Sequence, residues 1–120
     1  MNNALKMEEN QQSLSEKAQE FLNLARETAE DSSLPDRFEK TVEYFEQSLR
    51  AERNPKVLIE YAEFLEKHDQ ITIAFSYYEE ALEVYRTLAE QNSDYLSDVA
   101  DTLNKMAIFY FKVFFNFFSV

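Results

Sequence analysis

Carboxylates and one imidazole are the side chains of this sequence best suited to chemistry. Glu60, Glu63 and Glu66 are spaced three residues apart and would lie along one face of a helix. Such a ladder could bind a cation, but acids are ordinary on exposed helix faces, and we favour a solvated face. His68 follows at an expected helix end, where the helix dipole favours an imidazolium, so we interpret it as a structural residue.

The hydroxyl side chains do not complete a catalytic site. The serines have only His68 as a possible base, and the chain has no glycine for the tight turn of a nucleophile elbow. Tyr77, Tyr78 and Tyr85 fall within a helical pattern, where such rings serve as core or interface aromatics. We therefore predict a protein that is not an enzyme and that uses no metal or cofactor.

The composition excludes further kinds of site. The 120 residues include no Gly, no Cys and one His. Without glycine the chain cannot form a phosphate-binding P-loop or a dinucleotide fingerprint, and without cysteine it has no disulfide or zinc–thiolate site. The 23 acids against 12 bases give a net charge of −11, which disfavours nucleic-acid binding. The N-terminus lacks a secretion signal, so we expect a cytoplasmic protein.

Apolar residues recur at steps of three and four along five segments, which predicts an all-α fold of about five helices. Ser13 with Glu16 forms a capping-box signal before the first helix, Pro35 stands at the start of the second, and Asn54-Pro55 opens the third. Short connections predict antiparallel neighbours. The expected apolar stripes run over residues 14–28, 38–49, 58–65, 71–88 and 96–110.

The third and fourth segments have patterns of large and small residues that recur elsewhere in the chain. The third segment has a large residue, two positions that are aromatic and small, and another large residue: Leu58, Tyr61, Ala62 and Leu65. The fourth has a small–aromatic–small pattern followed by leucine: Ala74, Tyr78, Ala81 and Leu82. Related sets occur upstream, at Thr41, Phe45, Ser48 and Leu49, and downstream, at Leu103, Met106, Ala107 and Tyr110.

This spacing resembles the tetratricopeptide (TPR) repeat, especially the longer bacterial and kinesin-light-chain-like type. The resemblance implies a right-handed α-solenoid of antiparallel helix-turn-helix repeats. It divides a single domain, 13–120, into a degenerate unit (13–53), a best-matching unit (54–92) and a half unit with an aromatic tail (93–120), after a polar segment at 1–12. At the His68-Asp69 turn the usual glycine is missing, but Asp tolerates left-handed backbone geometry.

The resemblance also implies a peptide groove, because the first helix of each TPR unit lines one. Ile59 and Glu63 stand where relatives that grip acidic peptides carry donors, so we expect a neutral or basic protein or peptide partner. The alternative is that these positions are ordinary surface. The candidate groove residues are Lys56, Ile59, Glu60, Glu63, Lys67, Asp101, Asn104 and Ile108.

The C-terminus is unusually aromatic and too short, at 15 residues from Met106, to cross a bilayer, which takes about 20. Three interpretations are open: self-association, which we favour, then truncation of a longer protein, then membrane contact. We expect a non-catalytic interaction or scaffold module that forms a homo-oligomer, with a membrane-associated adaptor as the alternative. The candidate self-association residues are Phe109, Phe111, Phe114, Phe115, Phe117 and Phe118.

Overall fold

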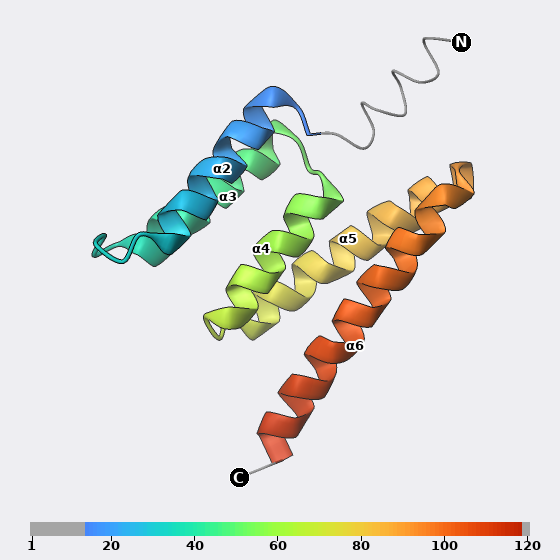
Figure 1. Cartoon of the computed structure of the whole chain (residues 1–120). Coiled ribbons are helices and arrows are strands. Elements are labelled where there is room, and N and C mark those ends of the chain that lie inside the picture. The colour runs from blue at the N-terminus through green and yellow to red at the C-terminus, as the bar shows by residue number, and fades with distance from the viewer. Residues whose placement is uncertain (1–13, 119–120) are drawn as a thin grey trace. The chain divides into compact units, whose positions relative to one another are not determined.

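The computed structural model describes residues 14–118, and in that range the chain is all-α, as predicted (Figure 1). A short 3-10 helix, η1 (Ser93–Tyr95), precedes the last helix, and the described residues include no strand. The five α-helices of the described range are α2 (Glu16–Glu30), α3 (Arg37–Ala51), α4 (Pro55–Lys67), α5 (Ile71–Gln91) and α6 (Leu96–Phe118).

The chain divides into two compact units, residues 1–57 and 58–120. The division falls within the first turn of α4. The predicted polar segment 1–12 and the predicted capping residue Ser13 lie outside the described residues. Within them, the residue that caps α2 is Ser15, whose side-chain oxygen accepts a hydrogen bond from the Ala18 N–H at 3.2 Å.

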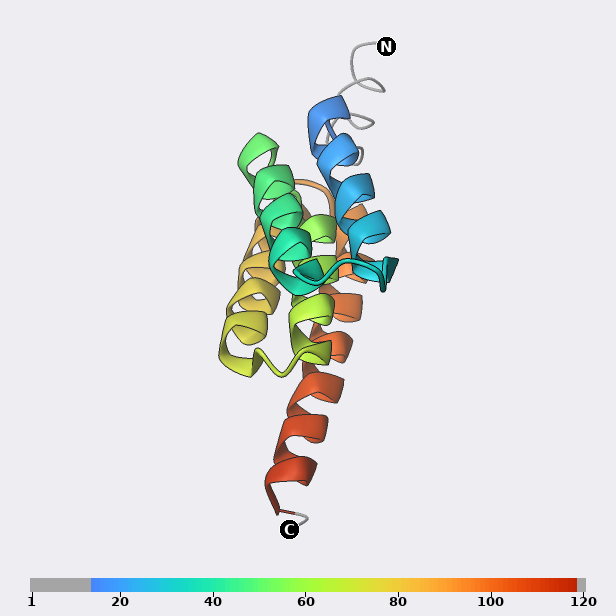
Figure 2. The same ribbon diagram turned by 90° about the vertical axis from the view of Figure 1, so that its left-hand side faces the viewer.

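In the first unit, α2 and α3 pack side by side as a helical hairpin (Figure 2). Small buried side chains, Ala18 and Ala25 on α2 and Thr41 and Ser48 on α3, allow the two backbones to approach closely. The Ser48 hydroxyl donates a hydrogen bond to the Ala18 carbonyl at 2.8 Å, so the polar group is satisfied inside the hairpin. The repeat pattern predicted at Thr41, Phe45, Ser48 and Leu49 is therefore a buried face.

The start of α4 agrees with the prediction from the sequence, and the start of α3 does not. Asn54 caps α4 as predicted, because its side-chain oxygen accepts from the Lys56 N–H at 2.9 Å and Pro55 is the first helical residue. Pro35, however, lies in a turn, and α3 begins two residues later at Arg37, so the expected helix start was wrong.

In the second unit, the turn from α4 to α5 is a Schellman motif. The Gln70 N–H donates to the Leu65 carbonyl at 2.9 Å and the Asp69 N–H donates to the Glu66 carbonyl at 3.2 Å. Asp69 has φ of 62°, the left-handed conformation that the sequence predicted this residue would accommodate in place of glycine.

The core of the second unit includes the repeat positions on α4 and α5. The ring of Tyr61 on α4 lies against the ring of Tyr77 on α5, with centroids 4.7 Å apart. The ring centroids of Tyr85 on α5 and Tyr95 in η1 lie 6.3 Å apart. All eight side chains of the best-matching pattern are buried, as expected: Leu58, Tyr61, Ala62, Leu65, Ala74, Tyr78, Ala81 and Leu82.

Helix α6 faces α5 with a different set of residues from the one predicted. Thr102, Met106 and Phe109 are buried, and of these only Met106 was expected. Three members of the predicted stripe are exposed instead: Leu96 by 58%, Leu103 by 44% and Tyr110 by 54%. Because α6 carries apolar residues on two sides, the spacing alone does not decide which side packs on α5.

Candidate interaction surfaces

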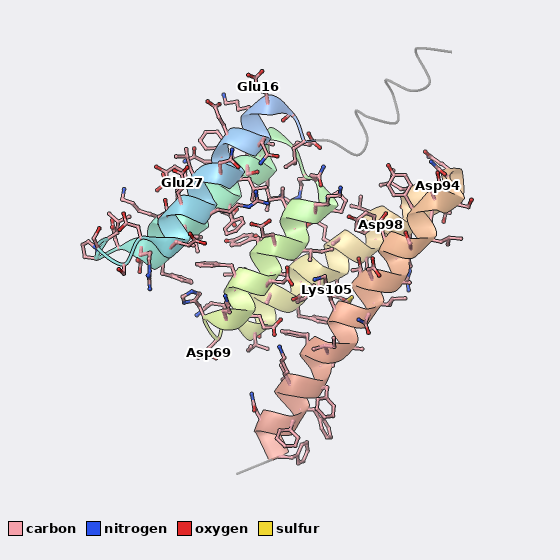
Figure 3. All side chains as sticks on the ribbon, in the orientation of Figure 1. Glu16, Glu27, Asp69, Asp94, Asp98 and Lys105 are labelled. Carbon is pink, nitrogen blue, oxygen red and sulfur yellow. The ribbon has the colours of Figure 1, made fainter. Side chains whose placement is uncertain are left out.

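Helices α4 and α6 are joined by two ion pairs. The Lys105 Nζ lies 3.0 Å from a Glu63 carboxylate oxygen, and the Lys112 Nζ lies 3.6 Å from Glu66 (Lys105 is labelled in Figure 3). Glu66 also accepts a hydrogen bond from the Tyr78 hydroxyl at 2.9 Å. Glu63 and Glu66, two of the three acids spaced three residues apart, therefore contact α6, and Glu66 also contacts α5. Residues 14–118 contain no cluster of acidic or His side chains that could hold a metal ion.

Two buried tyrosines have raised pKa values. Burial raises the pKa of Tyr78, and the hydrogen bond to Glu66 raises it further, because a phenolate beside a carboxylate is disfavoured. Burial, with the negative charge of Asp98, raises the pKa of Tyr85 to about 12. Both phenols are therefore protonated at neutral pH and act as structural hydrogen-bond donors or core rings.

The candidate groove residues lie on the helices expected, but their environments differ. Ile59 and Glu60 on α4 are half-buried. Glu63 forms an ion pair with Lys105 of α6, which is not a member of the candidate set, so a basic peptide bound there would compete with Lys105 for Glu63. The remaining candidates are exposed: Lys56, in the first unit, and Lys67, Asp101, Asn104 and Ile108 in the second.

Five of the six candidate self-association residues are exposed, and one is not. Phe109 is only 3% exposed, because it packs on Phe75 and Tyr78 of α5 with centroids 6.3 and 5.4 Å apart. We therefore remove Phe109 from the candidate surface. The other five phenylalanines, 59–75% exposed, are Phe111, Phe114, Phe115, Phe117 and Phe118.

The exposed phenylalanines stand on the last turns of α6, which extend beyond the start of α5 (Figures 1 and 2). The rings stack along the helix: the centroids of Phe111 and Phe115 lie 5.9 Å apart, and those of Phe114 and Phe118 lie 4.5 Å apart. Within residues 14–118, no helix is long and apolar enough to span a bilayer.

A second apolar stripe runs along the whole length of α6. We call it the outer stripe, and all of its residues are exposed: Leu96, Ala100, Leu103, Ala107, Tyr110, Phe114 and Phe117. Sequence reasoning recognised its aromatic end but assigned Leu103, Ala107 and Tyr110 to the core, as equivalents of Leu58, Ala62 and Leu65. The steps of three and four residues between its members were the signal that could have found it.

No family model, characterised protein or solved structure matches this chain. The resemblance to TPR proteins therefore depends on the spacing of residues. The positions that carry it are buried on α3, α4 and α5, but on α6 Leu103, Ala107 and Tyr110 are exposed.

Proposed function

We propose that this protein is a non-catalytic interaction or scaffold module, built on TPR-like helix pairs, that self-associates through α6. One observation carries the proposal. Of the eleven large apolar side chains that are exposed in the described residues, nine lie on α6. Contiguous apolar surface of this kind usually marks an interface, since isolated exposed residues would be scattered over the molecule.

The burial pattern supports the TPR-like part of the proposal. The small–aromatic–small positions Ala74, Tyr78 and Ala81 are buried, and so are their counterparts Thr41, Phe45 and Ser48. The same spacing thus serves the same packing role in both units. A helical scaffold of this kind acts by presenting a rigid surface, which fits a chain whose acids are largely on solvated faces.

A truncated chain tests this proposal against the alternative of a membrane-associated adaptor. The chain ending at Tyr110 lacks Phe111, Phe114 and Phe117 but keeps the core residue Phe109. We expect light scattering to give an oligomer of the 14.2 kDa full chain and a monomer, lighter than 14.2 kDa, for the shortened one. The membrane adaptor would be favoured if the full chain formed no oligomer in solution and co-sedimented with anionic or neutral liposomes while the shortened chain did not.

The partner of the candidate groove is proposed to be a neutral or basic peptide with apolar anchors. Glu60, Glu63 and Asp101 give the surface negative charge, and Ile59 and Ile108 give it apolar contacts. Titration with a basic peptide and with an acidic peptide of equal length tests the charge preference. Tighter binding of the acidic peptide would contradict it, and Glu63→Gln is expected to weaken binding of the basic one.

A further inference from the structure

The outer stripe has the spacing of a coiled-coil seam. From Leu96 to Phe117 its members alternate by four and three residues without interruption, and none of them is charged. An average step of 3.5 residues keeps such a seam on one side of a helix and directed at a partner helix over its full length. All seven members are exposed, although the ring of Tyr110, 54% exposed, also contacts Phe75 of α5 with centroids 5.2 Å apart. Most of the stripe is therefore left uncovered by the described helices of the chain.

We propose that the outer stripe pairs with the outer stripe of a second copy, with the two α6 helices antiparallel. The inference rests on the proposed self-association and adds its partner helix, direction and register. In the register that we propose, Ala107 lies opposite Tyr110, Ala100 opposite Phe117 and Leu103 opposite Phe114, with the two-fold axis between positions 108 and 109.

Side-chain size favours this direction. The small members of the outer stripe, Ala100 and Ala107, lie in its first two thirds, while Tyr110, Phe114 and Phe117 lie in the last third. Antiparallel pairing places each alanine against a ring, so that large and small side chains interdigitate. Parallel pairing in register would instead place Phe114 against Phe114 and leave the alanines facing each other across a gap.

Charge favours the same direction. The acids of this region, Asp94, Asp98 and Asp101, precede or lie in the first half of α6 and outnumber the one base there, Lys105, while the second half has Lys112 and no acid. In a parallel pair the acids of both copies would gather at one end. In an antiparallel pair they lie at opposite ends, and the dipoles of the two helices oppose each other favourably. The region 94–120 carries net −1, so it is the part of this acidic chain least opposed to self-contact.

The area available is sufficient for a stable pair. At about 200 Å² for a large side chain, the exposed fractions of the stripe and of its neighbours Phe111 and Phe118 leave roughly 800 Å² of apolar surface per copy. A standard interface buries about 800 Å² per partner. The second copy is therefore an occupant of the right size as well as of the right shape and charge.

Disulfide trapping tests the direction, because the chain has no native cysteine. We expect a mixture of Ala100→Cys and Phe117→Cys chains to form a mixed disulfide under mild oxidation. Each variant alone should not cross-link, since in the antiparallel pair its two cysteines lie about 26 Å apart along the axis, beyond the roughly 7 Å between Cα atoms that a disulfide allows. Asp101→Cys, rotated off the stripe beside Ala100, is the control and should not cross-link to Phe117→Cys.

A second pair, Leu103→Cys with Phe114→Cys, tests the same register should Phe117→Cys weaken the dimer. Light scattering of the unmodified chain tests self-association separately from the antiparallel register. A dimer whose single variants cross-link with themselves, or whose mixtures do not cross-link, would overturn the antiparallel register and leave self-association standing. A monomeric unmodified chain would overturn self-association and this inference together.

Discussion

The ring of Phe109 on α6 lies against the ring of Tyr78 on α5, with centroids 5.4 Å apart and both side chains buried. This contact determines which side of α6 faces the core. With Phe109 turned inward, Leu103, Ala107 and Tyr110 are turned outward, which creates the outer stripe. The surface proposed for self-association is therefore a consequence of how α6 packs on α5.

Replacing Phe109 should destabilise the second unit. Phe109→Ala removes a buried ring from between Phe75 and Tyr78, and such truncations cost about 3–5 kcal/mol. Urea denaturation followed by circular dichroism measures the loss. The matched control is Phe111→Ala, two residues away on the exposed side, which should change the free energy of unfolding of the monomer by no more than about 0.5 kcal/mol. Equal losses for the two variants would contradict the packing of α6.

A charge on the outer stripe should separate the copies. Leu103→Lys would place an ammonium group opposite Phe114 of the partner in a desolvated seam, and we expect it to be monomeric at concentrations where the unmodified chain is not. Ile108→Lys is the control, because Ile108 is similarly exposed, at 48% against 44%, but lies off the stripe. Light scattering reads the mass of each. Loss of the oligomer in Ile108→Lys alone would place the interface on another face.

The stability of the second unit should fall in alkaline solution. Below pH 10 Tyr85 is protonated in both the folded and the unfolded chain, so its titration contributes no change. Between pH 10 and about 12 the unfolded chain loses the proton first, because burial holds the folded pKa of Tyr85 at about 12. The free energy of unfolding should therefore drop across that window by about 2–3 kcal/mol from this residue.

The variant Tyr85→Phe isolates the contribution of Tyr85. It keeps the ring in the core, so its stability at pH 7 should be close to that of the unmodified chain, while its decline from pH 10 to 12 should be shallower. Thermal melts at a series of pH values provide the comparison. Parallel declines for the two chains would show that Tyr85 ionises no differently in the folded state.

Substitutions of the left-handed residue at the α4–α5 turn should change stability according to how readily the new residue adopts a positive φ. Asp69→Val forces a β-branched residue to φ near 62° and should cost about 1–2 kcal/mol. Asp69→Gly removes the steric cost of that conformation and should be close to neutral or slightly stabilising. Denaturant melts of both variants measure the difference. Equal stability of the two would mean that Asp69 does not hold a left-handed conformation in solution.

The parts of the fold that were predictable are those with one apolar face. On α4 and α5 the residues at helical spacing, such as Leu58 and Tyr78, had only one side on which to be buried, and they are buried. The Asn54 cap and the Asp69 turn were predictable because each depends on local backbone chemistry. The start of α3 was not, since Pro35 suits a turn as well as a first helical position.

The candidate surface was only partly predictable, because α6 has two apolar sides. Phe109 and Tyr110 are adjacent aromatics, and composition does not reveal that the first is buried and the second exposed. Only the position of α6 on α5 separates them. The ion pairs of Lys105 and Lys112 with α4 were likewise beyond the sequence, because they join residues far apart along the chain.

The mass of the unmodified chain in solution tests the central claim most directly. Light scattering across a range of protein concentrations should give a mass that rises from one copy of 14.2 kDa toward two copies as concentration increases. A mass of one copy at every concentration, with the helices intact by circular dichroism, would contradict self-association through α6.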